Sequence, residues 1–220
     1  MEIQNSALPL YVFASSIEFS RLFPSMPVPD GRAVLLPQGN AYVAVIGVGL
    51  LESAVNLAAI LKTQEFSCVI LIGICGAYKN HGLDVCDVVR VDSEIVGDVG
   101  VQERDGTFLP WSRVGGGSLK VYNAASVETA PANIRNLKSA TGISVNCCTG
   151  TDELAEMRNL LFDCDVESME GASVLAVCKA FGVLGYEVRA VSNFVGERKK
   201  SSWKIAEALL ALKNTVFDKS

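Results

Sequence analysis

The sequence has 220 residues, of which half are apolar and a fifth are charged. A chain of this length can bury one sizeable core, and we expect a single domain over residues 1–220. Its 24 acidic and 19 basic side chains give a formal net charge of -5, which disfavours a nucleic acid as partner because a polyanion would be repelled.

Short runs rich in β-branched and apolar residues alternate along the chain with segments of helical period. The predicted strands cover residues 10–14, 42–48, 68–72, 85–96, 143–147 and 186–191. The predicted helices cover residues 50–62, 151–161, 171–181 and 202–216. This alternation predicts a three-layer α/β/α sandwich with a central mixed, largely parallel sheet. Ligands of such sheets bind beyond the carboxyl ends of the strands.

The cysteines and the single histidine bear on metals and on the cellular compartment. The seven cysteines include no pair with the two-residue spacing of zinc or redox motifs, and His81 stands alone, so we expect no metal site. An odd number of cysteines without a secretion signal favours reduced thiols in the cytoplasm. We expect Cys147 and Cys148 to pack within a buried strand. The apolar residues 8–14 are too few to span a bilayer, so we expect no membrane partner.

Two glycine-rich turns follow predicted strands. Gly47 and Gly49 precede a predicted helix, which is the setting of a dinucleotide-binding turn, but Glu52 stands where the third glycine belongs. We therefore expect no such cofactor. Residues 73–76 (Gly-Ile-Cys-Gly) close another predicted strand, where glycine lets the backbone approach a ligand. Their spacing alone fits an ordinary turn equally well.

With one histidine and no metal cluster in the sequence, acid and base chemistry falls to carboxylates and amides near strand ends. Glu18, Glu170 and Asn193 each follow a β-rich run. Taken singly, each also has a structural interpretation. Both glutamates fit the first turn of a helix, where carboxylates suit the dipole, and Asn193 fits a turn.

Two runs together resemble the nucleoside phosphorylase and nucleosidase superfamily. Residues 166–171 (Val-Glu-Ser-Met-Glu-Gly) resemble its ribose-binding segment, and residues 189–193 (Arg-Ala-Val-Ser-Asn) resemble its base-binding strand end. Within the superfamily the sequence is most similar to the futalosine hydrolases. Four further segments carry this similarity, at residues 14–18, 73–77, 94–101 and 192–195. The resemblance implies hydrolysis of the N-glycosidic bond of futalosine, which releases hypoxanthine and dehypoxanthine futalosine in menaquinone biosynthesis.

The resemblance also implies roles for single residues. Hydrolysis of an N-glycosidic bond passes through a sugar that resembles an oxocarbenium ion. Glu170 matches the glutamate that binds the ribose hydroxyls, beside Met169 packed on the sugar, and Glu18 matches the general base that activates water. Glu167 lies in the ribose-binding segment. Cys75 and Gly76 would line the sugar and base through their backbone.

Asn193 stands where adenine-releasing relatives carry an aspartate. A 6-oxopurine presents two acceptors, O6 and N7, and an asparagine amide can donate to both, whereas a carboxylate would repel O6. Asn193 therefore favours hypoxanthine. The similar phosphorylases carry an arginine and a serine for phosphate where this chain has Leu71 and Ile74. Neither of these side chains binds an anion, which favours water as the nucleophile.

Other properties stay open at the level of sequence. The benzoate-bearing arm of futalosine needs an aromatic wall and a cation, for which the candidates are Arg104, Trp111, Arg198 and Trp203. The alternatives are a nucleosidase of the methylthioadenosine/S-adenosylhomocysteine type and a nucleoside-binding protein without turnover. We expect the partners to be a purine nucleoside, water and further copies of the chain in a homo-oligomer.

Overall fold

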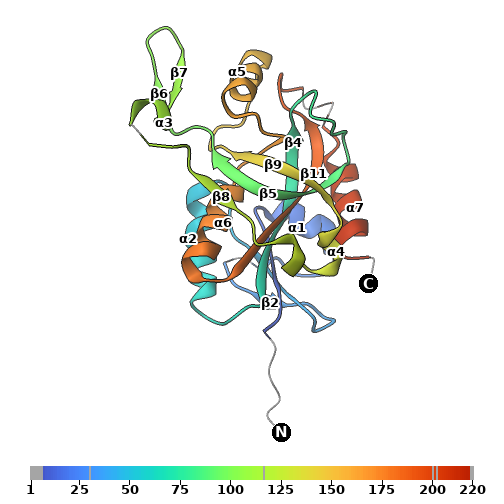
Figure 1. Ribbon diagram of the computed structural model, residues 1–220. Coiled ribbons are helices and arrows are strands. Elements are labelled where there is room, and N and C mark those ends of the chain that lie inside the picture. The colour runs from blue at the N-terminus through green and yellow to red at the C-terminus, as the bar shows by residue number, and fades with distance from the viewer. Residues whose placement is uncertain (1–6, 30, 116, 200, 202, 219–220) are drawn as a thin grey trace.

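A mixed sheet forms the centre of the fold, and helices cover both of its faces (Figure 1). The computed structural model describes residues 7–29, 31–115, 117–199, 201 and 203–218. Its strands are β1 (Leu10–Phe13), β2 (Val34–Leu35), β3 (Tyr42–Val45), β4 (Cys68–Ala77), β5 (Val88–Val96), β6 (Gly100–Gln102), β7 (Phe108–Pro110), β8 (Val121–Asn123), β9 (Lys138–Ser144), β10 (Val166–Ser168) and β11 (Leu184–Phe194). Its helices are α1 (Ser16–Leu22), α2 (Leu50–Leu61), α3 (Trp111–Val114), the 3-10 turn η1 (Val127–Thr129), α4 (Ala132–Arg135), α5 (Asp152–Phe162), α6 (Gly171–Phe181) and α7 (Ile205–Val216).

The strands of the main sheet follow the order β10-β9-β5-β11-β4-β1-β3-β2, and β8 pairs with β5. β1 runs parallel to β3 and β4, and β4 runs parallel to β11, whereas β5 runs antiparallel to β11. β10 pairs both with β9 and with the last residues of β4. This double pairing closes β4, β11, β5, β9 and β10 into a ring and brings β10 to the end of β4.

Alternation of side chains along the strands explains the three layers. On β1, Tyr11 and Phe13 pack with residues of α1, α4 and α7 on one face. Leu10 and Val12 pack with residues of α2 and α6 on the other face. Successive side chains of a strand point to opposite faces, so a strand that is apolar throughout must be covered on both sides. The predicted α/β/α sandwich is confirmed.

The predicted helices agree closely with the structure, and several strand ends do not. α6 begins and ends where the sequence predicts, and Thr151 caps α5 by accepting from the backbone N–H of Leu154. The predicted helix at 202–216 starts at Ser202, which lies outside the described residues, and α7 begins at Ile205. Helix α1, which follows β1 directly, is not among the predicted helices, although the helical interpretation of Glu18 agrees with its place in the first turn of α1.

The predicted turn at residues 73–76 is wrong, because these residues continue β4. Two glycines normally weaken a strand, but here every residue from 68 to 75 pairs with β11. Asn193 likewise lies inside β11 rather than in a turn. A register shift between Val191 and Asn193 interrupts the pairing there, and such a bulge redirects the side chains that follow it.

The predicted packing of Cys147 and Cys148 in a buried strand is also wrong. β9 ends at Ser144, and both cysteines are exposed in the loop that follows. Asp98 accepts the backbone N–H groups of Asn146 and Cys147 at 2.5 and 3.4 Å, which holds this loop away from the sheet.

A hairpin formed by β6 and β7 projects from the body of the molecule together with α3 (Figure 1). Among the described helices, none has the length and apolar character to cross a membrane. In the same part of the chain, no three histidine, cysteine, aspartate or glutamate side chains group closely enough to hold a metal ion.

Candidate active site

A cavity of about 490 Å³ opens where the ends of β1, β4, β10 and β11 meet. This is the edge at which ligands of parallel sheets bind. The seven residues that the sequence predicts for the site all line this one cavity: Glu18, Cys75, Gly76, Glu167, Met169, Glu170 and Asn193. The fold therefore brings together residues that lie up to 175 positions apart in the sequence.

Glu18 is buried at the first turn of α1. Its Oε2 accepts from the backbone N–H and the hydroxyl of Ser15, at 3.1 and 2.8 Å, in a capping box. Its Oε1 accepts from the backbone N–H of Ile74 at 3.1 Å. Burial raises the pKa of Glu18, while the positive charge of Arg189 and these hydrogen bonds oppose the rise. The carboxylate of Glu18 can therefore cap α1 and line the cavity at the same time, because only Oε2 takes part in the capping box.

Gly73 allows Glu18 and Arg189 to approach each other across β4. A side chain at this position would place a Cβ atom 2.7 Å from Nη1 of Arg189 and 2.8 Å from Oε1 of Glu18. Both contacts are too short for a carbon atom, so any larger residue would push the two charged groups apart. This close approach explains a glycine in the middle of a strand.

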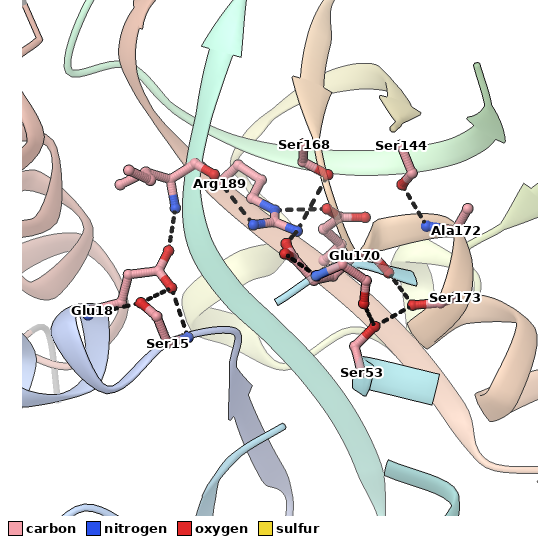
Figure 2. A network of polar contacts seen from close by, with 12 residues as sticks. Ser15, Glu18, Ser53, Ser144, Ser168, Glu170, Ala172, Ser173 and Arg189 are labelled. Carbon is pink, nitrogen blue, oxygen red and sulfur yellow. Dashed lines mark hydrogen bonds and ion pairs between the residues drawn. The ribbon is translucent and has the colours of Figure 1, made fainter. Parts of the chain in front are cut away.

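Arg189 lies at the centre of the charged groups, with 1% of its side chain exposed. Its Nε donates to Glu187 at 2.7 Å, and Nη2 donates to Glu170 at 3.2 Å and to the hydroxyl of Ser168 at 3.3 Å (Figure 2). Nη1 donates to the carbonyl of Ile74 at 3.2 Å. Burial disfavours the cation, but Glu187 and Glu170 outweigh that effect and raise the pKa of Arg189. The guanidinium therefore stays charged and fixes the carboxylates around it.

Glu170 precedes α6 and points into the cavity rather than capping its own helix. Its Oε1 accepts from the backbone N–H of Gly49 at 3.1 Å, and its Oε2 accepts from Arg189. Behind it, the hydroxyls of Ser53 and Ser173 lie 2.6 Å apart and bond to the carbonyls of Gly49 and Glu170, respectively (Figure 2). Contacts from the start of α2 and from α6 thereby fix the carboxylate of Glu170 at the cavity.

Glu167 also lines the cavity, but both of its oxygens already have protein partners. Thr149 donates from its backbone N–H at 2.7 Å and from its hydroxyl at 2.6 Å. Tyr78 donates at 2.9 Å and Arg158 at 3.0 Å. The buried ion pair of Arg158 and Glu167 joins α5 to β10, so Glu167 shapes this wall of the cavity. Its predicted contact with substrate stays a prediction.

Asn193 presents its amide at the end of β11. Ser192 donates to Oδ1 at 2.8 Å, and one N–H of the amide donates to the carbonyl of Phe194 at 2.9 Å. These two contacts orient the amide with nitrogen as donor. Its second N–H is available to a ligand, so donation to two acceptors of a base would require the bond to Phe194 to be shared or broken.

Gly76 and Cys75 form the floor beneath Asn193. A Cβ at Gly76 would lie 3.3 Å from Nδ2 of Asn193 and 2.9 Å from a methyl carbon of Val195, so glycine leaves room for both. The carbonyl of Cys75 accepts from Ser192 at 3.1 Å. Burial raises the pKa of the Cys75 thiol to about 12, which keeps it protonated and removes it as a nucleophile. The predicted contact of Cys75 and Gly76 with sugar and base through their backbone stays a prediction.

Several residues of the site are not predicted by the sequence. Gly49, from the turn considered for a cofactor, instead holds Glu170, and its positive φ of 86° suits glycine. Arg189 stands in the predicted motif, but its pairing with Glu170 depends on tertiary structure. A charged residue inside an apolar strand was the available signal, because such a residue must find partners when buried.

The candidates for the benzoate-bearing arm divide into two groups. Arg198 and Trp203 line the cavity, and the guanidinium of Arg198 lies over the Trp203 ring at 5.8 Å from its centre. Arg104 and Trp111 lie on the projecting hairpin and its following helix, outside the lining of this cavity. Cys148 and Thr149, in the loop after β9, also line the cavity.

Comparison with known proteins agrees with this geometry. A profile of the Phosphorylase superfamily matches residues 30–215. A futalosine hydrolase of Thermus thermophilus is 31% identical over 184 residues, which are 81% of this chain and 81% of that protein. Another, from Acidothermus cellulolyticus, is 33% identical over 196 residues, which are 86% of this chain and 79% of the relative. This chain belongs to the futalosine hydrolase family. The resemblance stated from its motifs is confirmed.

Solved structures share the fold at lower sequence identity. A native futalosine hydrolase of Helicobacter pylori superposes with a TM-score of 0.71 at 18% identity and covers 97% of this chain and 99% of its own. A 5′-methylthioadenosine/S-adenosylhomocysteine nucleosidase of the same organism gives a TM-score of 0.74 at 18% identity, covering 97% and 98%. These likenesses establish the architecture over nearly the whole chain.

Proposed function

We propose that this chain hydrolyses the N-glycosidic bond of futalosine and releases hypoxanthine. The observation that carries the proposal is the pair of buried carboxylates, Glu18 and Glu170, on one cavity with Arg189 between them. A glycosidic bond breaks through a cationic sugar, and two carboxylates with different surroundings suit the two tasks of charge stabilisation and water activation.

Glu170 performs the first task. Each of its oxygens accepts one hydrogen bond from protein, from Gly49 or from Arg189, and keeps a lone pair for a ribose hydroxyl. The negative charge so held offsets the positive charge that develops on the sugar, and it needs no rearrangement during the reaction. Met169, half-buried at the same wall, packs against the ribose.

Glu18 performs the second task. A general base works best when its pKa lies closer to the working pH than that of an ordinary glutamate, and burial raises the pKa of Glu18. Ser15 and Ile74 fix both oxygens, so the carboxylate meets a water molecule in one orientation. The proton taken from water passes to Glu18, while the new C–O bond forms at the anomeric carbon and the base departs with the electrons of the C–N bond.

Water rather than phosphate serves as the nucleophile in this proposal. Leu71 is fully buried in the apolar core between the sheet and helices α2 and α6. Ile74 places an apolar side chain at the cavity, and its backbone N–H is already used by Glu18. Leu71 and Ile74 offer no positive charge to a phosphate, and a phosphate beside Ile74 would also face the carboxylate of Glu18.

The second N–H of Asn193, which has no acceptor among the described residues, supports a base with an acceptor at its edge, such as hypoxanthine. For the benzoate-bearing arm, Arg198 and Trp203 offer a cation and an aromatic face at the cavity. The proposed homo-oligomer is supported by apolar side chains that are exposed on and beside the projecting hairpin, namely Val99, Val101, Trp111 and Val114.

One assay tests the proposal. The purified chain is incubated with futalosine, inosine and methylthioadenosine, each with and without phosphate, and the free base and sugar product are identified. We expect hypoxanthine from futalosine at a rate that phosphate does not change. Adenine released from methylthioadenosine as readily as hypoxanthine from futalosine would refute the substrate, and ribosyl phosphate as product would refute hydrolysis.

A further inference from the structure

Two carboxyl groups that the mechanism does not use lie behind the active site. Glu94 on β5 and Glu187 on β11 are both completely buried. A methyl group built at Gly171 would collide with Oε1 of Glu94 and with Oε2 of Glu187, so the two oxygens face each other across this glycine. Among the described residues, neither oxygen has any other hydrogen-bond partner.

The remaining oxygens of the pair have well-defined partners. Oε2 of Glu94 accepts from the hydroxyl of Ser144 at 2.8 Å, and that hydroxyl accepts from the backbone N–H of Ala172 at 2.9 Å. Oε1 of Glu187 accepts from Nε of Arg189 at 2.7 Å. The donors on both sides are therefore directed at the outer oxygens, and only the two inner oxygens lack a donor.

A proton between the inner oxygens completes the network. The inner oxygens of Glu94 and Glu187 both lie 2.5 Å or less from the place of a Cβ at Gly171, and two carboxyl groups placed in this way can hydrogen-bond to each other only when one of them is protonated. Two like charges at this distance in a buried site cannot both persist. Burial raises the pKa of both carboxyl groups, and for Glu94 the charge of Glu187 adds to the rise. Glu187 accepts from the guanidinium of Arg189, whereas Glu94 accepts from the neutral hydroxyl of Ser144, so the geometry favours the proton on Glu94.

We propose that Glu94 and Glu187 share one proton and that this pair positions Arg189, and through Arg189 the carboxylate of Glu170. The network runs from Ser144 through protonated Glu94 and ionised Glu187 to the guanidinium, whose other face holds Glu170. Glu94 and Glu187 are positioning residues, since neither lines the cavity. The catalytic part of this inference rests on the proposed function.

The matched substitutions Glu94→Gln and Glu187→Gln test the assignment, because they make the same chemical change at two facing positions. A glutamine at 94 accepts from Ser144 and donates an N–H to Glu187, as the acid does, so kcat/KM should stay within about threefold of wild type near pH 7. A glutamine at 187 removes the anion beside Nε of Arg189. The loosened guanidinium should lower kcat/KM by about 10²-fold, since small displacements of a positioned group have effects of that size. Equal losses in both variants would overturn the proposal.

The pH dependence of thermal stability gives a second readout that needs no substrate. The charged and titratable groups around Glu94 are Glu187 and Arg189 on β11, Glu170 before α6, Cys75 on β4 and Cys164 before β10. A group whose pKa is raised in the folded state contributes stability at pH below its unfolded pKa and loses it as the pH rises toward the folded pKa. Glutamine does not titrate, so Tm of Glu94→Gln minus Tm of wild type should grow between about pH 5 and about pH 8.

The outcomes separate this inference from the proposed function. A wild-type chain that releases no base from futalosine refutes the proposed function, and the Tm comparison still decides whether Glu94 is protonated. A Tm difference that does not change with pH overturns the shared proton. If neither variant folds, infrared spectroscopy of the wild-type chain decides the question, since a protonated carboxyl has a carbonyl band that an ionised pair lacks. Absence of that band at neutral pH would overturn the proposal.

Discussion

The backbone N–H of Ile74 donates to Oε1 of Glu18 at 3.1 Å. Ile74 occupies the place at which similar phosphorylases carry a phosphate-binding serine, and here its backbone holds the proposed general base. Its carbonyl accepts from Arg189 at 3.2 Å, so one residue of β4 bonds to both Glu18 and Arg189. Ile74 thus contacts the charged side chains through its backbone N–H and carbonyl, while its apolar side chain lines the cavity.

Replacement of Glu18 by glutamine should lower kcat by about 10²- to 10⁴-fold, the usual contribution of a general base. Substrate binding should persist, because glutamine keeps the size of the side chain and its acceptor toward Ile74. Steady-state kinetics and calorimetric titration with futalosine measure the two effects. Glu153→Gln is the matched control, since Glu153 is an exposed carboxylate in the first turn of α5. Loss of binding together with activity would argue against a role as base.

The acid limb of the kcat/KM profile should lie above the pH at which an ordinary glutamate titrates. Glu18 must be ionised to accept a proton, and burial raises its pKa, so activity falls as the pH drops through that raised value. The hydroxyl of Ser15 favours the ionised form. Ser15→Ala should therefore move the acid limb to higher pH.

The control for Ser15→Ala is Thr151→Ala, which removes the N-cap of α5 instead. Both substitutions should lower the free energy of unfolding by about 1 kcal/mol, because each removes a capping side chain. Only Ser15→Ala should shift the pH profile of kcat/KM. An equal shift in both variants would show that helix stability, rather than the hydrogen bond to Glu18, sets the profile.

Arg189→Lys should lower kcat/KM by about 10- to 100-fold although the positive charge is kept. A lysine cannot reach Glu187, Glu170 and the carbonyl of Ile74 at once, because its donors do not form a planar fork. Arg90→Lys is the control, on the neighbouring strand β5, where Arg90 pairs with Asp92 outside the cavity. It should lower Tm and leave kcat/KM within about twofold of wild type.

Asn193→Asp should slow release of hypoxanthine from futalosine by about 10²-fold, because an ionised carboxylate repels the O6 of the base and offers it no N–H. Folding should be unaffected, since the side chain lies at the cavity edge. Asn123→Asp, at an exposed position on β8, is the control for the added charge. A variant with unchanged kcat/KM on futalosine would remove Asn193 from base recognition.

Local patterns in the sequence sufficed for the four longest helices and for the layered architecture. The apolar period of α2 and the cap of α5 act within a few residues, so they can be read without tertiary contacts. The ends of the strands could not be predicted equally well from local patterns. Residues 73–76 have the composition of a turn, but they extend β4 by pairing with β11, and Gly73 leaves the space that Glu18 and Arg189 occupy.

The family and seven of the residues that line the cavity followed from the sequence itself, because the motifs around Glu170 and Asn193 lie in contiguous segments. Tertiary structure alone decided the electrostatic arrangement. Gly49 meets Glu170 from 121 positions away, and Glu94 meets Glu187 across Gly171. Which carboxylate is paired, which is desolvated and which carries a proton depends on distances between separate strands and helices. The sequence lists the titratable side chains, but it does not give the distances between them in the fold, on which their protonation depends.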